Sequence, residues 1–567
     1  MRKRIKWFVL LLMIISVVLT VRGLLKEPAV PERAYLQLDI NGTYVEAPPQ
    51  DLLGRFFASD EHTLVDLLAN IRKAKVDKRI KGVVARIGAL DAGWAKVEDI
   101  RDALADFKKS GKPLIAVLQQ EVTGANREYY LASVCDRIYL PPSATAPLVG
   151  LAAHFTFLGE VWEKLDIDMT VEKVAEYKTF GDMIGYKEMT AAHREMANSL
   201  LDSLNDHFVS TIAQARGLEA DDIRALIDRC PIQPQDFVDA HLADGAKYLE
   251  DLHDEIGGDE MPLLNARDYA QVSASSLKLD NGPQIAVVYA VGGIVSGEGG
   301  RSVQGEVLGS DRLIKALSDA AEDGDIKAIV FRIDSPGGSA LASDLIWRAT
   351  QAAQKKKPIV VSMSDVAGSG GYYIAAGASR IVAQPTTLTG SIGVVFARPN
   401  IKGLLNKIGV HTETITRGRF AAVDDLTTKL EPEGRAKLVE EMNHVYDVFV
   451  ERVANGRKLE PEQVRDVARG RVWTGAQAKE KGLVDTLGGF AVALQEAKAA
   501  AGLKADAEVE LVFYPRPEHL LERIAKLLSV RMATTLPPLL QNALRTLAFP
   551  FHEGSILTLM PESVEIR

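Results

Sequence analysis

Residues 326–362 read IKAIVFRIDSPGGSALASDLIWRATQAAQKKKPIVVS, and this stretch decides the class of fold. It contains two short β-branched runs, at residues 329–333 and 359–362, which are typical of buried strands. Between these runs, residues 340–357 carry apolar side chains at helical spacing, namely Leu341, Leu345, Ile346, Ala349 and Ala352. Strand, helix and strand in this order predict a βαβ unit and a parallel sheet, and therefore an α/β fold.

The same pattern occurs earlier in the chain, so the sequence contains an internal repeat. Residues 80–87 (IKGVVARI) match residues 326–333 (IKAIVFRI) at an offset of 326 − 80 = 246. Tyr129 matches Tyr372 at an offset of 372 − 129 = 243, and this register continues downstream without a gap. Agreement in one order over such a length indicates a tandem duplication, and we expect each copy to form its own α/β domain.

The duplication divides the chain into five segments. We assign residues 1–25 to a basic cytoplasmic segment and a transmembrane anchor, 26–45 to a linker, 46–275 to the first repeat, 283–505 to the second repeat, and 506–567 to a C-terminal tail. Residues 520–532 of the tail are amphipathic, which favours a helix packed against the body over a helix lying on a membrane surface.

The N-terminus has the pattern of a membrane signal. Four basic residues within the first six precede an uncharged stretch at residues 7–21, whose helix would span about 22 Å of the ~30 Å hydrocarbon core. Extension to Leu25 gives enough length if Arg22 reaches back to the interface. Small residues at the spacing of a cleavage site are missing, so we expect an uncleaved anchor, with a removed signal peptide as the alternative. The basic end would stay in the cytoplasm and the remaining chain would lie on the far side.

Composition argues against several functional classes. A net charge of −9 over 567 residues, without a basic stripe, does not suit a protein whose main partner is nucleic acid. The two cysteines, Cys135 and Cys230, exclude a disulfide framework, and no Cys/His cluster has the spacing of a metal site. Cys135 lies in an apolar run, where a buried and inert thiol is expected. We therefore expect neither a metal nor a cofactor.

Two glycine-rich turns in the second repeat are candidates for chemistry. Residues 334–339 (DSPGGS) follow a strand and precede a helix, so their backbone N–H groups are placed to bind an oxyanion or a phosphate. Residues 367–373 (AGSGGYY) put Ser369 between glycines at a second strand-to-helix turn, as in a nucleophile elbow. The strict G-x-S-x-G pattern is missed because Ala367 holds the first glycine position. Either turn, taken alone, also fits ordinary connecting structure with a helix-capping serine.

A nucleophilic serine needs a base, and the duplication indicates where to look for it. His411 and His444 follow Ser369 in the sequence, but neither lies in a recognisable site context. Ser369 corresponds to Asn126 in the first repeat, which therefore lacks the nucleophile. Lys178 of the first repeat corresponds to Ala421, so the second repeat lacks this lysine. Each copy has kept a group that the other has lost.

Four motifs together resemble a known family. The runs EYK (176–178), SPGGS (335–339), GSGGYYIA (368–375) and LTGSIGV (388–394) are similar in order and spacing to the long, duplicated form of the signal peptide peptidase A family. The resemblance covers roughly residues 45–500. It implies two tandem domains of the Clp protease/crotonase-like α/β fold and a Ser/Lys dyad divided between the copies.

The resemblance also assigns roles to individual residues. It implies that Ser369 is the nucleophile, Lys178 the general base and Ser391 the hydroxyl that orients the lysine amine, with an oxyanion hole formed by the backbone N–H groups of Gly338 and Gly370. Burial between two domains would lower the pKa of such a lysine, because loss of solvent disfavours the ammonium form. The neutral amine could then take the serine proton during attack on a peptide carbonyl.

The implied partners and location follow from the same family. We expect short, mostly apolar peptides such as signal peptides as substrates, a ring-like homo-oligomer that is a homotetramer, and a single-pass anchor in the bacterial inner membrane with the catalytic domains in the periplasm. Three alternatives remain at this point: a crotonase-like acyl-CoA enzyme that uses Gly337 and Gly338, a Ser-His-Asp esterase, and a non-enzymatic scaffold. The exported location opposes the acyl-CoA enzyme, because coenzyme A is cytoplasmic.

Overall fold

The computed structural model describes residues 30–46, 62–121, 124–302, 305–516, 557–559 and 565–566. The predicted anchor at residues 1–25 and the amphipathic segment at residues 520–532 lie outside these ranges. Within the ranges, no helix has both the length and the apolar character that a membrane crossing requires.

The first repeat is built on a parallel sheet. Its strand order is β2-β1-β3-β4-β5-β8, and β9 pairs with β1 along the edge opposite β3. The strands are β1 (Ala34–Val45), β2 (His62–Thr63), β3 (Ile80–Asp91), β4 (Leu114–Leu118), β5 (Arg137–Leu140), β8 (Gly245–Ala246) and β9 (Leu263–Asn265). The prediction of a linker at residues 26–45 is therefore wrong in its second half, because residues 34–45 form a central strand with alternating buried positions.

The second repeat has a sheet of the same order. The series β22-β10-β14-β16-β17-β21 repeats the series β9-β1-β3-β4-β5-β8 of the first repeat. Its strands are β10 (Gln284–Val291), β14 (Ile326–Ser335), β16 (Ile359–Gly368), β17 (Arg380–Ala383), β21 (Thr486–Leu487) and β22 (Glu510–Tyr514), with β18 (Leu388–Gly390) beside β16 and β20 (Val472–Thr474) beside β18. The shared order supports the duplication. Because β22 pairs with β10, the second repeat extends past the predicted boundary at residue 505.

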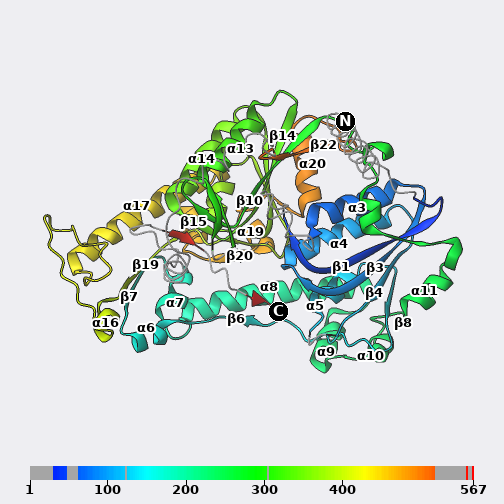
Figure 1. Cartoon of the computed structure of the whole chain (residues 1–567), viewed down its shortest axis with the longest axis horizontal. Coiled ribbons are helices and arrows are strands. Elements are labelled where there is room, and N and C mark those ends of the chain that lie inside the picture. The colour runs from blue at the N-terminus through cyan, green and yellow to red at the C-terminus, as the bar shows by residue number, and fades with distance from the viewer. Residues whose placement is uncertain are drawn as a thin grey trace, which may run out of the picture.

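A third sheet joins the two repeats. Its order is β12-β13-β11-β15-β23-β19-β7, and β7 (Asp168–Val174) is the strand that comes from the first repeat. The other strands are β11 (Gly293–Val295), β12 (Gly299–Ser302), β13 (Gly305–Gly309), β15 (Gly337–Ser339), β19 (Val394–Asn400) and β23 (Leu557–Leu559). Figure 1 shows the two repeats side by side, with β7 and β19 at the same end of the molecule.

Helices cover the sheets and extend beyond them. Those of the first repeat are α3 (Leu64–Val76), α4 (Trp94–Lys108), α5 (Asn126–Ala132), α6 (Gly159–Leu165), α7 (Phe180–Gly185), α8 (Ala191–Arg216), α9 (Ala220–Arg229), α10 (Pro234–Asp239), α11 (Leu249–Glu255) and α12 (Ala266–Ala270). Those of the second are α13 (Ser310–Glu322), α14 (Ala340–Gln354), α15 (Gly370–Ala375), α16 (Lys402–Lys407), α17 (Pro432–Arg457), α18 (Pro461–Val467), α19 (Gly475–Glu480) and α20 (Phe490–Ala500). Two short strands, β6 (Ala153–His154) and β24 (Glu565–Ile566), pair with each other. Helix α8 runs from the first repeat along the second, where Ser203 hydrogen-bonds to Thr474.

Helix α14 confirms the predicted βαβ unit but buries a different face from the one that its large apolar residues suggest. Ala342, Ile346 and Ala353 are buried, whereas Leu341 and Leu345 are exposed. Small residues allow the helix to approach the sheet closely, so they form the packed face and the leucines point to solvent.

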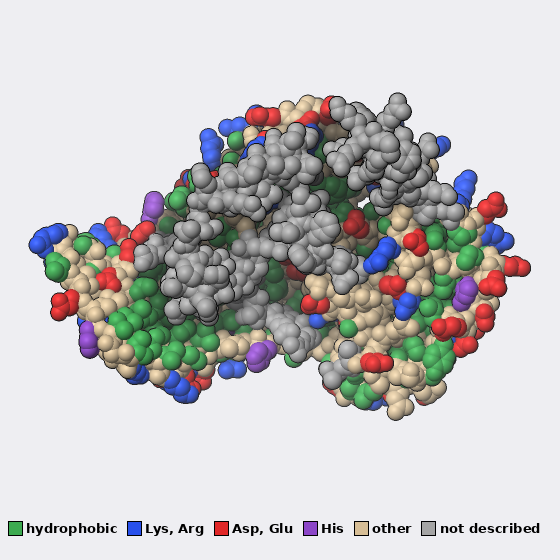
Figure 2. Space-filling model, viewed as in Figure 1, with side chains coloured by type: hydrophobic (Ala, Val, Ile, Leu, Met, Phe, Trp, Pro, Cys, Tyr) green, Lys and Arg blue, Asp and Glu red, His purple; other side chains and the backbone are tan. Residues whose placement is uncertain are grey.

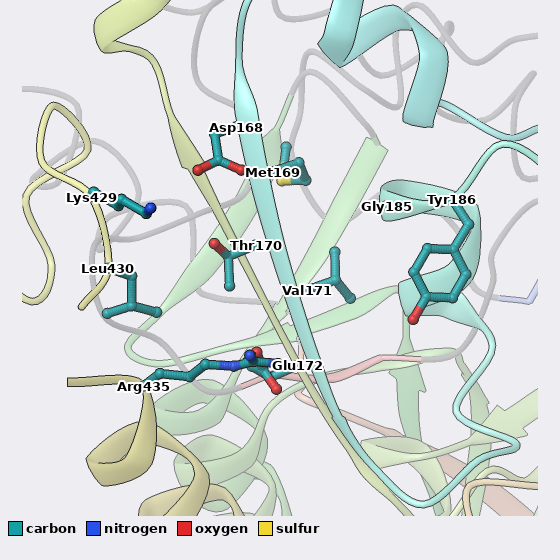
Figure 3. Close-up of a pocket in the computed structure, with 10 residues that line it drawn as sticks. All are labelled: Asp168, Met169, Thr170, Val171, Glu172, Gly185, Tyr186, Lys429, Leu430 and Arg435. Atoms are coloured by element: carbon teal, nitrogen blue, oxygen red, sulfur yellow. The ribbon is translucent and has the colours of Figure 1, made fainter. Parts of the chain in front are cut away.

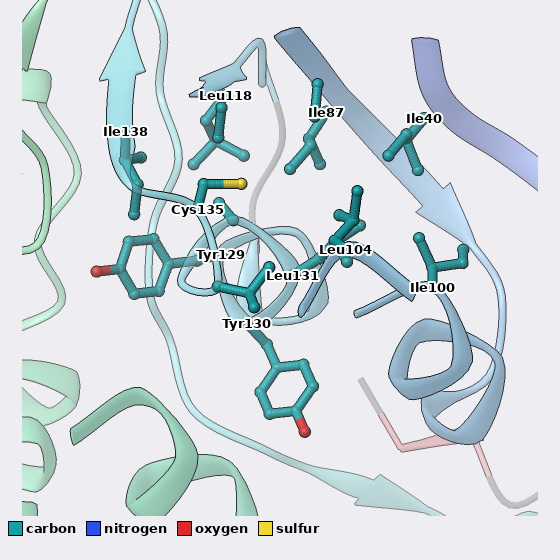
Figure 4. Packing of buried hydrophobic residues seen from close by; sticks show 14 of the residues in the cluster. Ile40, Ile87, Ile100, Leu104, Leu118, Tyr129, Tyr130, Leu131, Cys135 and Ile138 are labelled. Carbon is teal, nitrogen blue, oxygen red and sulfur yellow. The ribbon is translucent and has the colours of Figure 1, made fainter. Parts of the chain in front are cut away.

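The core of the first repeat lies between its sheet and helices α4 and α5. Figure 4 shows Ile87 and Leu118 of the sheet facing Ile100 and Leu104 of α4. Cys135 is buried in this cluster, as predicted, and burial raises the pKa of its thiol to about 12. The thiol is therefore protonated and unreactive at neutral pH.

The two repeats also meet through a buried ion cluster. Arg332 on β14 is 1% exposed and donates hydrogen bonds to Glu46 at 2.9 Å and to Asp99 at 2.7 Å. Both carboxylates belong to the first repeat. Burial alone would raise the pKa of Glu46, but the charge and hydrogen bonds of Arg332 hold it at about 2. The cluster fixes one repeat against the other.

Candidate active site

Lys178 belongs to the first repeat but lies inside the second. It stands in the loop between β7 and α7, and β7 forms an antiparallel ladder with β19 from Val174 opposite Val394 to Asp168 opposite Asn400. Because seven residue pairs hold this ladder, the loop that follows β7 enters the second repeat in a fixed register.

The structure brings together Lys178, Ser369 and Ser391. The Lys178 Nζ is 2.7 Å from the Ser369 Oγ, 3.0 Å from the Ser391 Oγ and 2.8 Å from the Ser391 carbonyl oxygen. All three residues are at most 1% exposed. A neutral amine has two N–H donors and one lone pair, so it can donate to both Ser391 oxygens and accept the Ser369 proton. The contacts of the nitrogen therefore match those of an uncharged base.

Burial provides the electrostatic condition for this arrangement. It lowers the pKa of the Lys178 amine well below the ordinary value of 10.5, and burial is the only cause of the shift. A carboxylate near the amine would hold its proton in place, but among the described residues none forms an ion pair with Lys178. The site thus favours the unprotonated form that a general base requires.

Ser369 stands at a sharp turn between β16 and α15. Its backbone has φ 54° and ψ −114°, a conformation that is costly for a residue with a side chain. The Ser369 N–H donates to the Gly390 carbonyl at 2.8 Å, and the Ser369 hydroxyl makes no capping hydrogen bond to α15. The capping role considered from sequence is therefore not observed, and the hydroxyl points to the lysine instead.

The two glycines predicted to form an oxyanion hole lie in β15 and at the start of α15. Gly338 lies on β15 with φ 155°, and a Cβ at this position would be 2.0 Å from the Ile294 carbonyl oxygen, so only glycine fits. The turn before it is fixed by Ser335, whose hydroxyl donates to the Gly292 carbonyl and accepts the Gly337 N–H. Gly370 opens α15, where the first N–H groups have no partner within the helix.

A loop that the sequence analysis missed holds the lysine in place. Gly470 packs against Lys178 so closely that a Cβ on this glycine would be 2.5 Å from the lysine backbone nitrogen. The Arg469 carbonyl accepts the Tyr177 N–H at 3.0 Å, and the Arg471 carbonyl accepts the Ser391 N–H at 2.7 Å. The guanidinium groups of both arginines lie over the Tyr177 ring. The sequence gives only one trace of this loop, a glycine between two arginines.

Comparison with known proteins agrees with this geometry. The sequence profile described as peptidase family S49 matches residues 106–258 and residues 351–504, one match in each repeat and together more than half of the chain. The chain belongs to peptidase family S49. The duplication is thus a pair of tandem S49 domains, and the protein is a serine peptidase rather than an acyl-CoA enzyme or a scaffold.

Curated relatives match from about one third to nine tenths of the chain. A protein named Serine protease SPPA, chloroplastic, from Arabidopsis thaliana is 37% identical over 80% of this chain and 68% of its own length. Protease 4 from Salmonella typhi is 33% identical over 90% of this chain and 85% of its own length. A putative signal peptide peptidase SppA from Enterococcus faecium is 36% identical over 36% of this chain and 59% of its own length. The recognition as the signal peptide peptidase A family is confirmed.

Each S49 domain has lost the group that the other retains. Asn126, which takes the place of Ser369, donates to the Gly150 carbonyl at 2.7 Å and accepts the N–H groups of Val149 and Gly150 at 3.2 Å. Its amide therefore closes a loop. Ala421, which takes the place of Lys178, lies in an exposed segment.

The described residues give no support to the alternative of a Ser-His-Asp esterase. His411 and His444 are exposed, and in the parts of the chain that the structure covers no histidine hydrogen-bonds to Ser369. A serine peptidase with a Ser-His-Asp triad would need such a contact.

A cavity of about 290 Å³ lies beside β7, the strand that precedes the Lys178 loop, and does not include the lysine. Figure 3 shows Asp168, Thr170 and Glu172 of β7 on one side of it and Lys429 and Arg435 on the other. The guanidinium of Arg435 pairs with the carboxylate of Glu172.

Proposed function

We propose that the protein is a membrane-anchored endopeptidase that cleaves short hydrophobic peptides, such as signal peptides left after secretion, with a Ser369/Lys178 dyad. The observation that carries the proposal is the buried 2.7 Å contact between the Lys178 Nζ and the Ser369 Oγ. Each domain supplies one half of the pair, which accounts for the presence of two diverged copies in one chain.

The reaction proceeds in two steps on this dyad. Neutral Lys178 takes the Ser369 proton as the Oγ attacks the peptide carbonyl carbon, and the N–H groups of Gly338 and Gly370 stabilise the oxyanion. The lysine ammonium then gives its proton to the leaving amine, and the C–N bond breaks to leave an acyl-enzyme. Lys178, neutral again, takes a proton from the water that attacks the ester carbon, and it returns this proton to the Ser369 Oγ as the C–O bond breaks and the acid is released. Ser391 keeps the amine directed at Ser369 throughout.

An extended chain already lies beside the oxyanion turn. Strand β23, from the C-terminal region, pairs antiparallel with β15 through Thr558 opposite Gly338, and on its other side with β19 through Leu557 opposite Val395. Peptides commonly bind proteins by adding a strand in this way. This pairing supports a peptide substrate that binds in extended form with its backbone along β15.

The anchor, the periplasmic location and the homotetramer belong to the same proposal. The basic cluster before residues 7–21 supports an inner-membrane anchor with the S49 domains in the periplasm. Self-association is supported by exposed apolar side chains at one end of the molecule. Figure 2 shows hydrophobic side chains gathered there, and the exposed ones are Val161, Leu165, Tyr186, Ile408, Val410, Ile415 and Phe420.

Cleavage of a synthetic signal peptide by the full-length protein in detergent tests the proposal. The wild-type protein is expected to cut within the apolar segment of the peptide, as mapped by mass spectrometry, and to ignore acyl-CoA thioesters. Ser369→Ala and Lys178→Met are expected to be inactive with unchanged circular dichroism spectra. Peptide cleavage at the wild-type rate by either variant would refute the dyad.

A further inference from the structure

Lys96 of the first domain connects two strands of the second. Its Nζ is 2.6 Å from an Asp334 carboxylate oxygen on β14 and 2.7 Å from an Asp365 carboxylate oxygen on β16. The Lys96 backbone N–H also donates to Asp365 at 3.0 Å, and the Val366 N–H donates to Asp334 at 3.1 Å. The side chains of the three charged residues are only 12–16% exposed. The two strands are therefore joined both directly and through the lysine.

These strands end in the two catalytic turns. Asp334 is followed at once by Ser335, which fixes the turn to Gly338, and Asp365 lies four residues before Ser369 on the strand that ends at the nucleophile. Ser335 is also in register with Ala367. A shift of either strand end at the carboxylates would therefore change the distance between the oxyanion donors and the serine hydroxyl.

The counterparts of Lys96, Asp334 and Asp365 in the opposite copies cannot form the same cluster. By the offset of 246, Asp334 corresponds to Gly88 and Lys96 corresponds to Ala342. Ile87 pairs with Leu118 in the first repeat as Ile333 pairs with Met363 in the second. Two residues further along, the counterpart of Asp365 is therefore Gln120. As with the dyad, the cation has been kept in one domain and its partners in the other.

Packing and charge hold Lys96 in this position. Gly93, the residue at the start of α4, lies so near Asp365 that a Cβ on it would be 2.2 Å from the carboxyl carbon. Burial lowers the pKa of Lys96, but the negative charges of Asp334, Asp365 and Glu46 raise it by a larger amount. The pKa is therefore well above 10.5, and the side chain stays an ammonium. The ammonium can therefore hold both carboxylates across the pH range in which Lys178 titrates.

We propose that Lys96 is a positioning residue, which links the oxyanion turn to the nucleophile turn and makes their geometry depend on the docking of the first domain. The inference rests on the function proposed above. It means that the first domain contributes twice to the site, through Lys178 as the base and through Lys96 as the link between the turns.

Peptide kinetics of Lys96→Met test the inference, with Lys73→Met as the matched control. Lys73 is also a buried first-domain lysine, but its Nζ donates to the carbonyls of Tyr269, Ala270 and Val272, away from the catalytic strands. We expect K96M to lower kcat about 10- to 100-fold per folded molecule with little change in KM, because small displacements of reacting groups have effects of this size. K73M is expected to keep the wild-type kcat, and Lys96→Arg to recover at least tenfold over K96M.

The outcomes separate this inference from the proposed function. If a fluorophosphonate fails to label Ser369 in the wild-type protein, the dyad itself is wrong. If the wild-type protein is labelled and folded K96M keeps the wild-type kcat, or K73M loses as much, the positioning role is wrong. Should K96M not fold, Asp365→Asn, which removes the charge and keeps the shape, takes its place with the same expected loss of kcat and the same refuting result.

Discussion

Two unfavourable features meet where Lys178 contacts Ser369, and each fits the chemistry proposed for this pair. A buried amine without a counter-charge loses the solvation of its ammonium form, and Ser369 holds a positive φ that side chains avoid. Neither feature is explained by stability, because removal of either would relieve strain or desolvation. Such features are retained where function requires them.

Lys178→Met should separate activity from stability. We expect peptide cleavage to fall by about 10²–10⁴-fold, the usual effect of losing a general base. The thermal midpoint should be equal or higher at pH 7, because the folded wild-type chain must leave the amine unprotonated whereas the unfolded chain protonates it. Between the lowered folded pKa and 10.5 the unfolded state binds the extra proton, so wild-type stability rises with pH and the advantage of the variant shrinks. Calorimetry at several pH values measures this difference, and a lower midpoint for the variant at pH 7 would contradict it.

Gly338→Ala should damage the oxyanion turn. The added methyl group would be 2.0 Å from the Ile294 carbonyl, so β15 must move and its donor with it. We expect kcat to fall by about 10²–10³-fold, as for loss of one oxyanion donor. Gly324→Ala is the matched control, because nothing lies within 4 Å of a Cβ there. A wild-type kcat in folded G338A would remove Gly338 from the site.

At the residue scale, the sequence predicted the groups that short motifs carry and missed the groups that distant segments supply. Ser369, Ser391 and Lys178 were identified from local motifs, and the structure places them in contact. The positions of Gly470 and Lys96 beside the site could not be predicted from the sequence, because they depend on contacts with residues more than 200 positions away. No local pattern encodes such a contact.

At the scale of elements, the pairing of β7 with β19 is what assembles the site. Periodicity predicted the strands and helices of the second repeat, but it could not predict that a strand of the first domain would extend a sheet of the second. Periodicity also predicted the wrong buried face for α14, where Leu341 and Leu345 are exposed. The spacing of apolar residues does not show which face of a helix can approach the sheet closely. The strand at residues 34–45 could not be distinguished from a linker in the sequence, because the strands that pair with it lie far along the chain.

Arg332→Met should weaken the contact between the domains. The substitution removes the guanidinium that pairs with the buried carboxylates of Glu46 and Asp99, and we expect a loss of about 3–5 kcal/mol in the free energy of unfolding at pH 7. Arg332 keeps Glu46 ionised down to about pH 2, so its contribution is present above the unfolded pKa near 4.5 and is lost as pH falls toward 2. The difference between variant and wild type should therefore be smaller at pH 4 than at pH 7.

Urea unfolding at the two pH values gives this measurement. Arg72→Met is the control, since Arg72 also links the domains, through Asp280 and Glu508, but is about one-third exposed. Exposed pairs of this kind contribute up to about 1 kcal/mol. Equal losses in R332M and R72M would show that the buried cluster does not lock the domains together.

At the scale of the whole molecule, duplication and divergence account for two S49 domains in one chain and for the division of the proposed dyad between them. The two sheets share their strand order, yet Asn126 and Ala421 stand in the places of Ser369 and Lys178 in opposite copies. The tandem duplication could be predicted from offsets in the sequence. The angle and contacts between the domains could not, because they depend on ion pairs and strand pairings that bridge the two copies.

Self-association should depend on the apolar end of the molecule. Ile415 is 86% exposed and Ile408 is 67% exposed, and a charge at either position would oppose burial in an interface. We expect Ile415→Asp combined with Ile408→Asp to shift the protein from tetramer to monomer in mass photometry, without loss of secondary structure. A wild-type protein that is monomeric at micromolar concentration would rule out the proposed tetramer.

The rate of fluorophosphonate labelling as a function of pH tests the dyad most directly, because acylation of the serine needs the base but not the peptide site. For the wild-type protein we expect labelling at Ser369, located by mass spectrometry, with a rate that rises as Lys178 loses its proton at a pH well below 10.5. Lys178→Met should label at least about 100-fold more slowly and without that pH dependence. Labelling of the variant at the wild-type rate, with the same pH profile, would contradict the claim that an amine from one domain activates an alcohol from the other.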